Sequence, residues 1–189
     1  MNTEYEVRIL NINVQEIIQK LESLKAEKIF DALQKRYVYD FKPKINNKWI
    51  RLRTNGKKTT LTIKDLTAKT IDGTKELEIE VSDFEKMNLI LKDLGYIPKG
   101  YQENKRIQYQ LNGVEVDIDY WPLIPTYLEI EGSSEEEVYN TLELLGFTKE
   151  NITTKDVETI YLDYGYNLEE IYDLKLEEER KWHYLKNYN

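Results

Sequence analysis

The sequence contains no cysteine and only one histidine, His183. Without cysteine there can be no disulfide bond, no thiolate metal ligand and no cysteine nucleophile. His183 lies in a strongly charged carboxyl-terminal stretch, where a serine–histidine–aspartate triad is not expected. Composition therefore argues against hydrolases that depend on a cysteine nucleophile or on such a triad.

The sequence also lacks a long apolar run. None approaches the ~18 residues that a transmembrane helix requires, and residues 1–4 do not begin the basic-then-apolar pattern of a signal peptide. We therefore expect a cytoplasmic protein with no membrane partner. With 189 residues, of which 40% are hydrophobic, the chain is long enough for one domain with a sizeable core. We expect that domain to span residues 1–189, with a charged helical tail from about residue 167.

An excess of basic residues is missing as well. The formal net charge is −8, whereas binding of a nucleic acid requires a basic face that neutralises phosphates. We therefore expect no nucleic-acid partner. The Gly-x-x-x-x-Gly-Lys-Ser/Thr pattern is also absent, so a nucleotide would not be held by a P-loop. A small phosphate compound can still bind, because an enclosed cluster of arginine and lysine holds an anion whatever the global charge.

Three segments show the apolar spacing of amphipathic helices. Asn13 precedes the first as an N-cap, Ser82 and Glu85 form a capping-box pair ahead of the second, and Ser134 and Glu137 do the same for the third. A glycine ends the second and the third. The apolar positions of these helices lie within residues 14–24, 84–94 and 138–145.

A strand with the pattern Glu-x-Glu precedes each of these helices, which indicates a weak internal repeat. Other segments are rich in β-branched and aromatic residues and are typical of strands. Asn55-Gly56 and Asn112-Gly113 each predict a hairpin turn between two of them. The Glu-x-Glu strands are Glu4–Arg8, Glu76–Val81 and Leu128–Glu131, and the others are Arg36–Phe41, Trp49–Arg53, Thr59–Lys64, Arg106–Leu111 and Val114–Tyr120.

Nearly every expected strand has one apolar face and one ionic face, because alternate residues of a strand point to the same side. An open sheet with its ionic face in water would explain any one strand. The ionic faces carry sets of like charge, however, which repel one another and require compensation. These sets are Glu4 and Glu6; Arg51 and Arg53; Glu76, Glu78 and Glu80; Glu115, Asp117 and Asp119; and Glu129 and Glu131.

Closing the sheet into a barrel would bring the acidic and basic sets together across a shared interior. Helices would then cover the apolar outside, so we predict an α+β fold with a central β-barrel. The planar fork of arginine matches phosphate oxygens, and Mg²⁺ or Mn²⁺ prefers carboxylate oxygens and commonly bridges to substrate phosphates. Acidic and basic sets together therefore indicate a metal ion and a polyphosphate.

The order of these segments resembles the CYTH superfamily, the triphosphate tunnel enzymes, which includes class IV adenylate cyclases and thiamine triphosphatases. The resemblance covers most of the chain, and the stretch from Asp119 to Glu131 carries it best. Thr154-Lys155-Asp156 and Tyr164-Gly165-Tyr166 resemble the tail of the class IV cyclase-like branch. The matching pieces are Glu4–Arg8, Trp49–Arg53, Leu61–Lys64, Glu78–Glu80, Lys105-Arg106, Asp119 and Tyr127–Gly132.

The resemblance implies an eight-stranded antiparallel barrel around a triphosphate tunnel, with Mg²⁺ or Mn²⁺ as cofactor. It also implies roles for particular residues, with Lys64 as the candidate catalytic group. The phosphate-binding residues would be Arg8, Arg51, Arg53, Lys64, Arg106 and Lys155; the metal ligands Glu4, Glu6, Asp119, Glu129 and Glu131; and the supporting acidic residues Glu78, Glu80 and Asp117.

Arg8 departs from the family pattern, because the resemblance places a lysine at this position. Arginine binds phosphate at least as well but stays protonated and cannot act as a general base. If a lysine there activates water in some members, this chain must use a metal-bound hydroxide or another base.

Three functions remain open at this point. The first is metal-dependent hydrolysis of a phosphoanhydride in tripolyphosphate or in a nucleoside or other organic triphosphate. The second is class IV adenylate cyclase activity, in which ATP gives cyclic AMP and pyrophosphate. The third is binding without catalysis, as a polyphosphate or nucleotide sensor. The expected partner is a triphosphate-containing small molecule such as ATP or tripolyphosphate, and a homodimer is possible.

Overall fold

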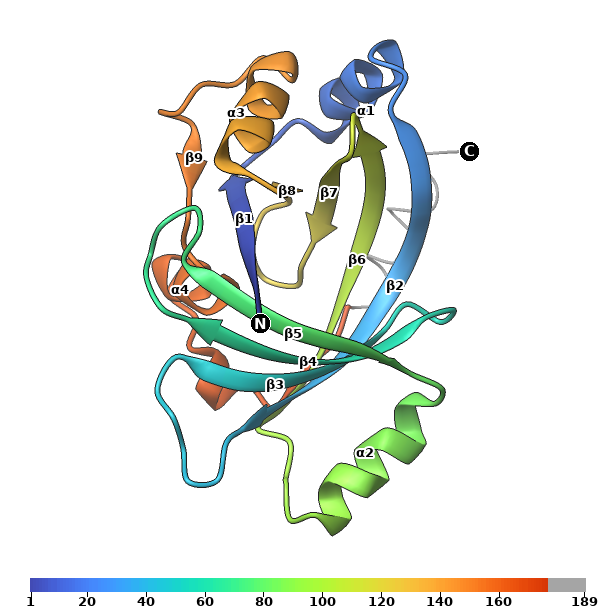
Figure 1. Cartoon of the computed structure of the whole chain (residues 1–189), viewed down its shortest axis with the longest axis vertical. Coiled ribbons are helices and arrows are strands. Elements are labelled where there is room, and N and C mark those ends of the chain that lie inside the picture. Colours follow the sequence, from blue (N-terminus) through green and yellow to red (C-terminus); the bar gives the residue numbers. More distant parts are fainter. Residues whose placement is uncertain (177–189) are drawn as a thin grey trace.

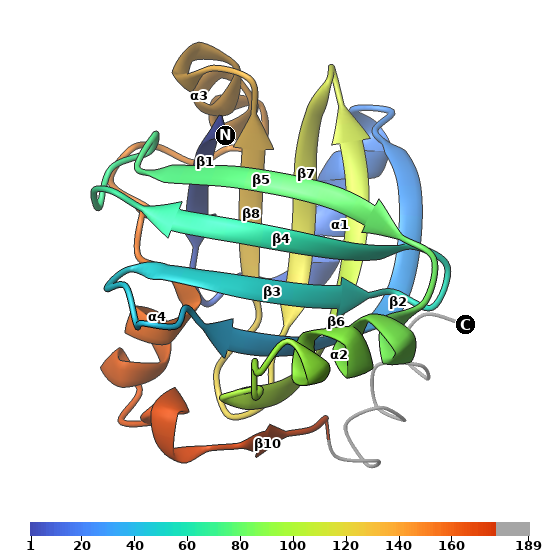
Figure 2. The same ribbon diagram turned by 60° about the horizontal axis from the view of Figure 1, so that its bottom comes forward.

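The computed structural model describes residues 1–176, and the strands among them form one sheet that closes on itself. Eight antiparallel strands make the barrel in the order β6-β2-β3-β4-β5-β1-β8-β7, and pairing of β7 with β6 completes it. Figure 2 shows β3, β4 and β5 crossing over β1, β8, β7 and β6. The strands are β1 (Asn2–Ile9), β2 (Glu27–Asp40), β3 (Lys48–Thr54), β4 (Thr59–Leu66), β5 (Thr74–Val81), β6 (Gly100–Leu111), β7 (Val114–Tyr120) and β8 (Tyr127–Gly132).

Helices lie outside the barrel wall (Figure 1), as the sequence predicts. Helices α1 (Val14–Ser23) and α3 (Glu135–Leu144) pack on the apolar outer faces of β1, β6, β7 and β8, which form the largest core cluster. Helix α2 (Phe84–Asp93) packs over Tyr39, Ile50 and Leu52 of β2 and β3. The hydrophobic core of this protein is therefore the layer between wall and helices, and the interior of the barrel is left to polar side chains.

Helix α4 (Val157–Asp163) and the 3₁₀ turn η1 (Leu168–Glu170) cover one end of the barrel. Ile160 and Tyr161 of α4 and Leu168 of η1 belong to one buried apolar cluster with Trp121 and Tyr127. Two short strands extend the sheet: β9 (Ile152–Thr153) pairs with β1, and β10 (Asp173–Leu174) pairs in parallel with β6. Among the described residues, no helix is long and apolar enough to cross a membrane.

The helix starts follow the predicted caps with one shift. Asn13 and Ser134 are the N-caps of α1 and α3, as predicted. The second helix begins one residue later than Ser82 indicates, because the carboxylate of Asp83 accepts a hydrogen bond from the Lys86 backbone N–H at 2.9 Å and so takes the capping role. In the third helix, Glu137 accepts hydrogen bonds from Ser133 rather than completing a capping box with Ser134.

Two strands, β2 and β6, extend far beyond the predicted segments, whereas the other barrel strands differ from them by at most three residues in length. β2 has 14 residues and β6 has 12. The apolar pattern did not predict the additional residues, because their inward positions carry polar side chains such as Gln34 and Asn104. Asn112 and Gly113 form the predicted two-residue turn, with φ of 54° and 89°. The turn at Asn55 is wider, since four residues separate β3 from β4 and the Asn55 side chain accepts hydrogen bonds from two backbone N–H groups within it.

The tail expected to be helical from residue 167 is not an α-helix in its described part. Residues 168–170 form a single 3₁₀ turn and residues 173–174 form β10. Leu174 and Leu176 are buried, and β10 pairs with β6, so this part of the tail adds to the sheet and does not project into solvent. The charged run at 177–181 and His183 lie outside the described residues.

The β4–β5 loop is fastened to β1 at the position of a site residue. Ile71 of this loop is buried, and its carbonyl accepts a hydrogen bond from the backbone N–H of Glu6 at 2.9 Å. The loop closes through Gly73, whose carbonyl accepts from the Thr67 N–H at 2.8 Å and whose N–H donates to the Thr70 carbonyl at 3.0 Å. A Cβ at residue 73 would overlap the backbone carbonyl of Ala68.

We therefore predict that Gly73→Ala lowers the free energy of unfolding by about 2 kcal/mol or more, because the overlap is with backbone and cannot be relieved by a side-chain rotation. Urea denaturation measures the effect. Gly100→Ala is the matched control: its Cβ would meet nothing closer than 3.8 Å, so a change within about 1 kcal/mol is expected. Equal losses in both variants would contradict this account of the loop.

Candidate functional site

The inward faces of the eight strands enclose a polar interior, which we call the lumen. Two cavities of about 260 Å³ and about 130 Å³ occupy it. They share wall residues, among them Arg8, Arg51 and Trp121, so they are two parts of one space. Cations facing this space come from five of the eight strands: Arg8, Arg36, Arg51, Arg53, Lys64 and Arg106.

Three arginines on β2 and β3 form a basic group with few carboxylate partners. Arg36 and Arg53 are directly paired across the two strands, and Arg51 lies two residues before Arg53 on β3. Two carboxylates serve the three arginines: Glu76 lies 3.4 Å from Arg51, and Glu78 lies 3.6 Å from Arg51 and 3.9 Å from Arg53. We refer to Arg36, Arg51 and Arg53 as the arginine triad.

Arg36 is the least compensated of the three. It is 6% exposed and, within the described part of the chain, has no carboxylate partner. It donates hydrogen bonds to the neutral side chains of Gln34, at 3.0 Å, and Asn104, and lies 4.5 Å over the ring of Trp121. Burial, followed by repulsion from Arg53, Arg51 and then Arg106, lowers the pKa of Arg36 well below its usual value. An anion bound here would relieve that repulsion.

Arg53 is likewise repelled by neighbouring arginines. Burial, together with the nearby charges of Arg51 and Arg106, lowers the pKa of Arg53 to about 10 against the opposing effects of Glu78 and Glu76. A buried group of guanidinium ions is costly unless an anion accompanies it. A bound anion would offset this cost, and the fork geometry of the three side chains suits phosphate oxygens.

Arg106 on β6 is compensated by carboxylates on β7 and β8. It lies 2.5 Å from Asp119 and 2.9 Å from Glu129, and also pairs with Asp117. Burial alone would lower the pKa of Arg106, but these three carboxylates raise it well above its usual value. Asp117 and Asp119, predicted as a supporting acid and a metal ligand, thus bind this guanidinium in the structure.

Lys64 lies between two carboxylates, 2.9 Å from Glu4 and 2.9 Å from Glu76. Burial and Arg51 lower its pKa, but Glu6, Glu4 and Glu76 outweigh them and raise it. Burial also raises the pKa of Glu4 to about 9, while that of its neighbour Glu76 is lowered by Glu4, Lys64 and Arg51 against the effect of burial. Lys64 is thus held in its protonated form, which suits binding of an anion and does not favour a role as a base.

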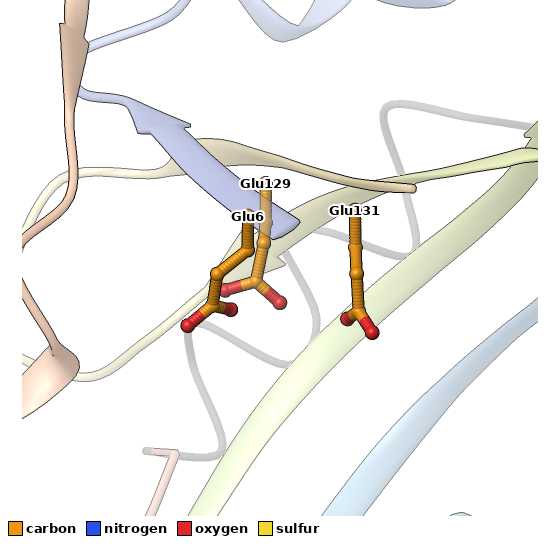
Figure 3. A group of neighbouring side chains, drawn as sticks. All are labelled: Glu6, Glu129 and Glu131. Atoms are coloured by element: carbon orange, nitrogen blue, oxygen red, sulfur yellow. The ribbon is translucent and has the colours of Figure 1, made fainter. Parts of the chain in front are cut away.

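An acidic trio stands on β1 and β8, where Glu6 and Glu131 are directly paired and Glu129 is two residues away (Figure 3). One carboxylate oxygen from each of Glu6, Glu129 and Glu131 lies within 4.8 Å of the others. Burial, then the charges of Glu6, Glu129 and Glu115, raise the pKa of Glu131 to about 7 against the opposing effect of Lys64. Three crowded oxygen donors could hold a hard divalent cation.

The structure places the other predicted residues as follows. Glu78 faces the lumen and accepts a hydrogen bond from Thr62 at 2.7 Å. Glu80 lies at the rim, with its side chain 67% exposed. The ammonium group of Lys155 pairs with Asp163 at 2.6 Å and is 44% exposed, so only its backbone carbonyl reaches the site, where it accepts from Arg8 at 3.0 Å.

Sequence reasoning missed Arg36, although it identified the strand that carries it. Alternation from Val38, which faces the lumen, would have placed Arg36 on the same side, but a lone arginine at the start of an aromatic strand gave no like-charge doublet. Glu76 was recognised on its strand without a role. The smaller cavity also has apolar wall residues to which the sequence patterns gave no role, including Trp49, Trp121 and Val157.

Comparison with known proteins agrees with this architecture. The CYTH domain family matches residues 2–161. A protein from Pyrococcus horikoshii has 25% sequence identity and a TM-score of 0.70, with 81% of this chain and 96% of that chain covered. No curated protein sequence matches the chain.

Two further solved structures share the fold. A Vibrio parahaemolyticus protein proposed as an adenylate cyclase has a TM-score of 0.72 at 11% identity, with 85% of this chain and 98% of that chain covered. A Hippeastrum protein proposed as an adenylyl cyclase, and reported to have a dominant triphosphatase activity, has a TM-score of 0.56 at 17% identity, covering 87% and 96%. The match over residues 2–161 together with the closed barrel shows that this chain belongs to the CYTH domain family.

Proposed function

We propose that the protein hydrolyses a phosphoanhydride bond of a triphosphate, such as tripolyphosphate or a nucleoside triphosphate, with Mg²⁺ or Mn²⁺ as cofactor. The observation that carries the proposal is the uneven pairing of the lumen charges. Among the described residues the arginine triad has only Glu76 and Glu78 as carboxylate partners. In the acidic trio opposite, Arg8 pairs with Glu6 and Glu129, but Glu131 has no cation at ion-pair distance in the same part of the chain, and its carboxylate neighbours raise its pKa. A bound triphosphate would neutralise the arginine triad, and a divalent ion would neutralise the acidic trio.

The residues divide the work by charge. Arg36, Arg51 and Arg53 would bind phosphate oxygens, and the protonated Lys64 would offset the negative charge that develops on the phosphoryl group. Glu6, Glu129 and Glu131 would hold the metal ion, which when bound can polarise a phosphoryl oxygen and lower the pKa of bound water. The closed wall orients the chain of phosphates and limits access of bulk solvent.

The first test concerns Arg36. We predict that Arg36→Gln lowers the affinity for tripolyphosphate about tenfold to a hundredfold, since it removes charged hydrogen bonds to phosphate. The same change should leave the thermal midpoint unchanged or higher, because a buried charge without a carboxylate partner costs stability. Calorimetric titration and thermal unfolding measure the two effects.

Lys35→Gln is the matched control, since Lys35 is the exposed neighbour of Arg36 on the same strand and faces the other side of the wall. It removes the same charge and should alter neither affinity nor midpoint. If Arg36→Gln binds tripolyphosphate as tightly as the unmodified protein, the triad is not the phosphate site.

The second test concerns the acidic trio. We predict that a chelator abolishes hydrolysis, that Mg²⁺ or Mn²⁺ restores it, and that Glu131→Gln raises the Mn²⁺ concentration for half-maximal orthophosphate release at least about tenfold. Glu80→Gln removes a carboxylate at the exposed rim and should change this concentration little. An unchanged metal requirement in Glu131→Gln would exclude the trio as the metal site.

The third test identifies the reaction. The protein with Mn²⁺ receives ATP and, separately, tripolyphosphate, and ³¹P NMR resolves the products. We predict orthophosphate from at least one of the two. Cyclic AMP with pyrophosphate would instead identify a cyclase, and binding without turnover would identify a sensor.

A further inference from the structure

Arg8 occupies the carboxylates that a metal ion in the acidic trio would need. Its Nη2 donates to Glu6 Oε2 at 2.8 Å and lies 2.7 Å from Glu129 Oε2. One nitrogen therefore bridges two of the three members of the trio. Arg8 is 6% exposed, so solvent screens these contacts little.

The bridge is held from a second side by a distant part of the chain. Nη1 of Arg8 donates to the backbone carbonyl of Lys155 at 3.0 Å. Lys155 lies between β9 and α4, so this hydrogen bond joins a side chain of β1 to a segment that is remote in the sequence. A guanidinium has two terminal nitrogens in a fixed fork and can make both contacts at once, whereas a lysine ammonium is a single point of charge.

Arg8 retains one capacity that these contacts do not use. Its Nε is buried and has no hydrogen-bond partner among residues 1–176. The side chain also lines both cavities of the lumen, as do Arg36 and Arg51 of the arginine triad. It is therefore placed to exchange carboxylate partners for phosphate oxygens without leaving the lumen.

We propose that Arg8 acts as an internal counter-cation that keeps a divalent ion out of the trio until a triphosphate binds. The inference rests on the proposed function and adds the order in which the triphosphate and the metal ion bind. Without triphosphate, an incoming ion must compete with Arg8 for oxygens of Glu6 and Glu129 and meets its positive charge at short range. A bound triphosphate supplies negative charge to Arg8 and frees those oxygens, so that metal and triphosphate bind with positive coupling.

The test measures Mn²⁺ binding without triphosphate, by the loss of the free-ion signal in electron paramagnetic resonance. We expect weak binding by the unmodified protein and an affinity at least about tenfold higher in Arg8→Gln, because removal of one positive charge from the site favours a cation. Addition of tripolyphosphate should then raise the Mn²⁺ affinity of the unmodified protein more than that of the variant. Unchanged or weaker Mn²⁺ binding in Arg8→Gln would overturn the proposal.

Arg53→Gln is the matched control, because it removes one arginine from the lumen that contacts neither Glu6 nor Glu129. It should change Mn²⁺ affinity less than about threefold; an equal gain in both variants would overturn the specific role of Arg8.

Thermal unfolding checks that Arg8→Gln folds. If it does not, Arg8→Lys keeps the charge and loses the second nitrogen, and is expected to bind Mn²⁺ about threefold more tightly; no gain would overturn the proposal.

These arms separate the two proposals. Mn²⁺ affinity without triphosphate does not depend on any reaction, so it tests Arg8 even in a protein without activity. Failure of the unmodified protein to bind or cleave tripolyphosphate would refute the proposed function. The Mn²⁺ affinities of the variants would still show whether Arg8 keeps the ion out of the trio.

Discussion

Charge pairing inside the barrel is the constraint on which the rest of the structure depends. The strands turn ionic side chains inward, where removal from water costs several kcal/mol per ion unless partners are well placed. Glu129 illustrates the compensation: burial would raise its pKa, but Arg8 and Arg106 lower it below its usual value. The observed register of the closed wall brings such partners together, so closure of the barrel and compensation of its buried charges are linked.

The buried cations are well paired on one side of the lumen and poorly paired on the other. On β6, β7 and β8 each buried cation has close carboxylates, as Arg106 has. On β2 and β3 the arginine triad repels itself, and Arg36 relies on neutral partners and the ring of Trp121. This imbalance lowers stability, and it leaves a binding capacity that an anion can use. In the proposed function, the same residues therefore lower the stability of the protein and provide its affinity for the anion.

The apolar side of the wall makes this arrangement possible. Leu and Val side chains of β1, β6, β7 and β8 face outward and pack against α1 and α3, while α2 covers β2 and β3. Burial of these faces supplies the hydrophobic stabilisation that a barrel with an apolar interior would obtain from its centre. The helix ends are set by local capping at Asn13, Asp83 and Ser134, so the outer layer folds from signals that are separate from the lumen charges.

The sequence by itself determined which residues share a face, because side-chain alternation along a strand is a local property of the backbone. It thereby predicted the inward sets, the outer helices and the closed α+β barrel. Only the tertiary structure decided which charges meet. Glu4 lies with Lys64, Asp119 with Arg106, and the trio consists of Glu6, Glu129 and Glu131. Register and barrel closure join strands far apart in the chain, and no local pattern encodes those pairings. Arg36 was missed for the same reason: its importance comes from the partners it lacks, and that became visible only when the wall was closed around it.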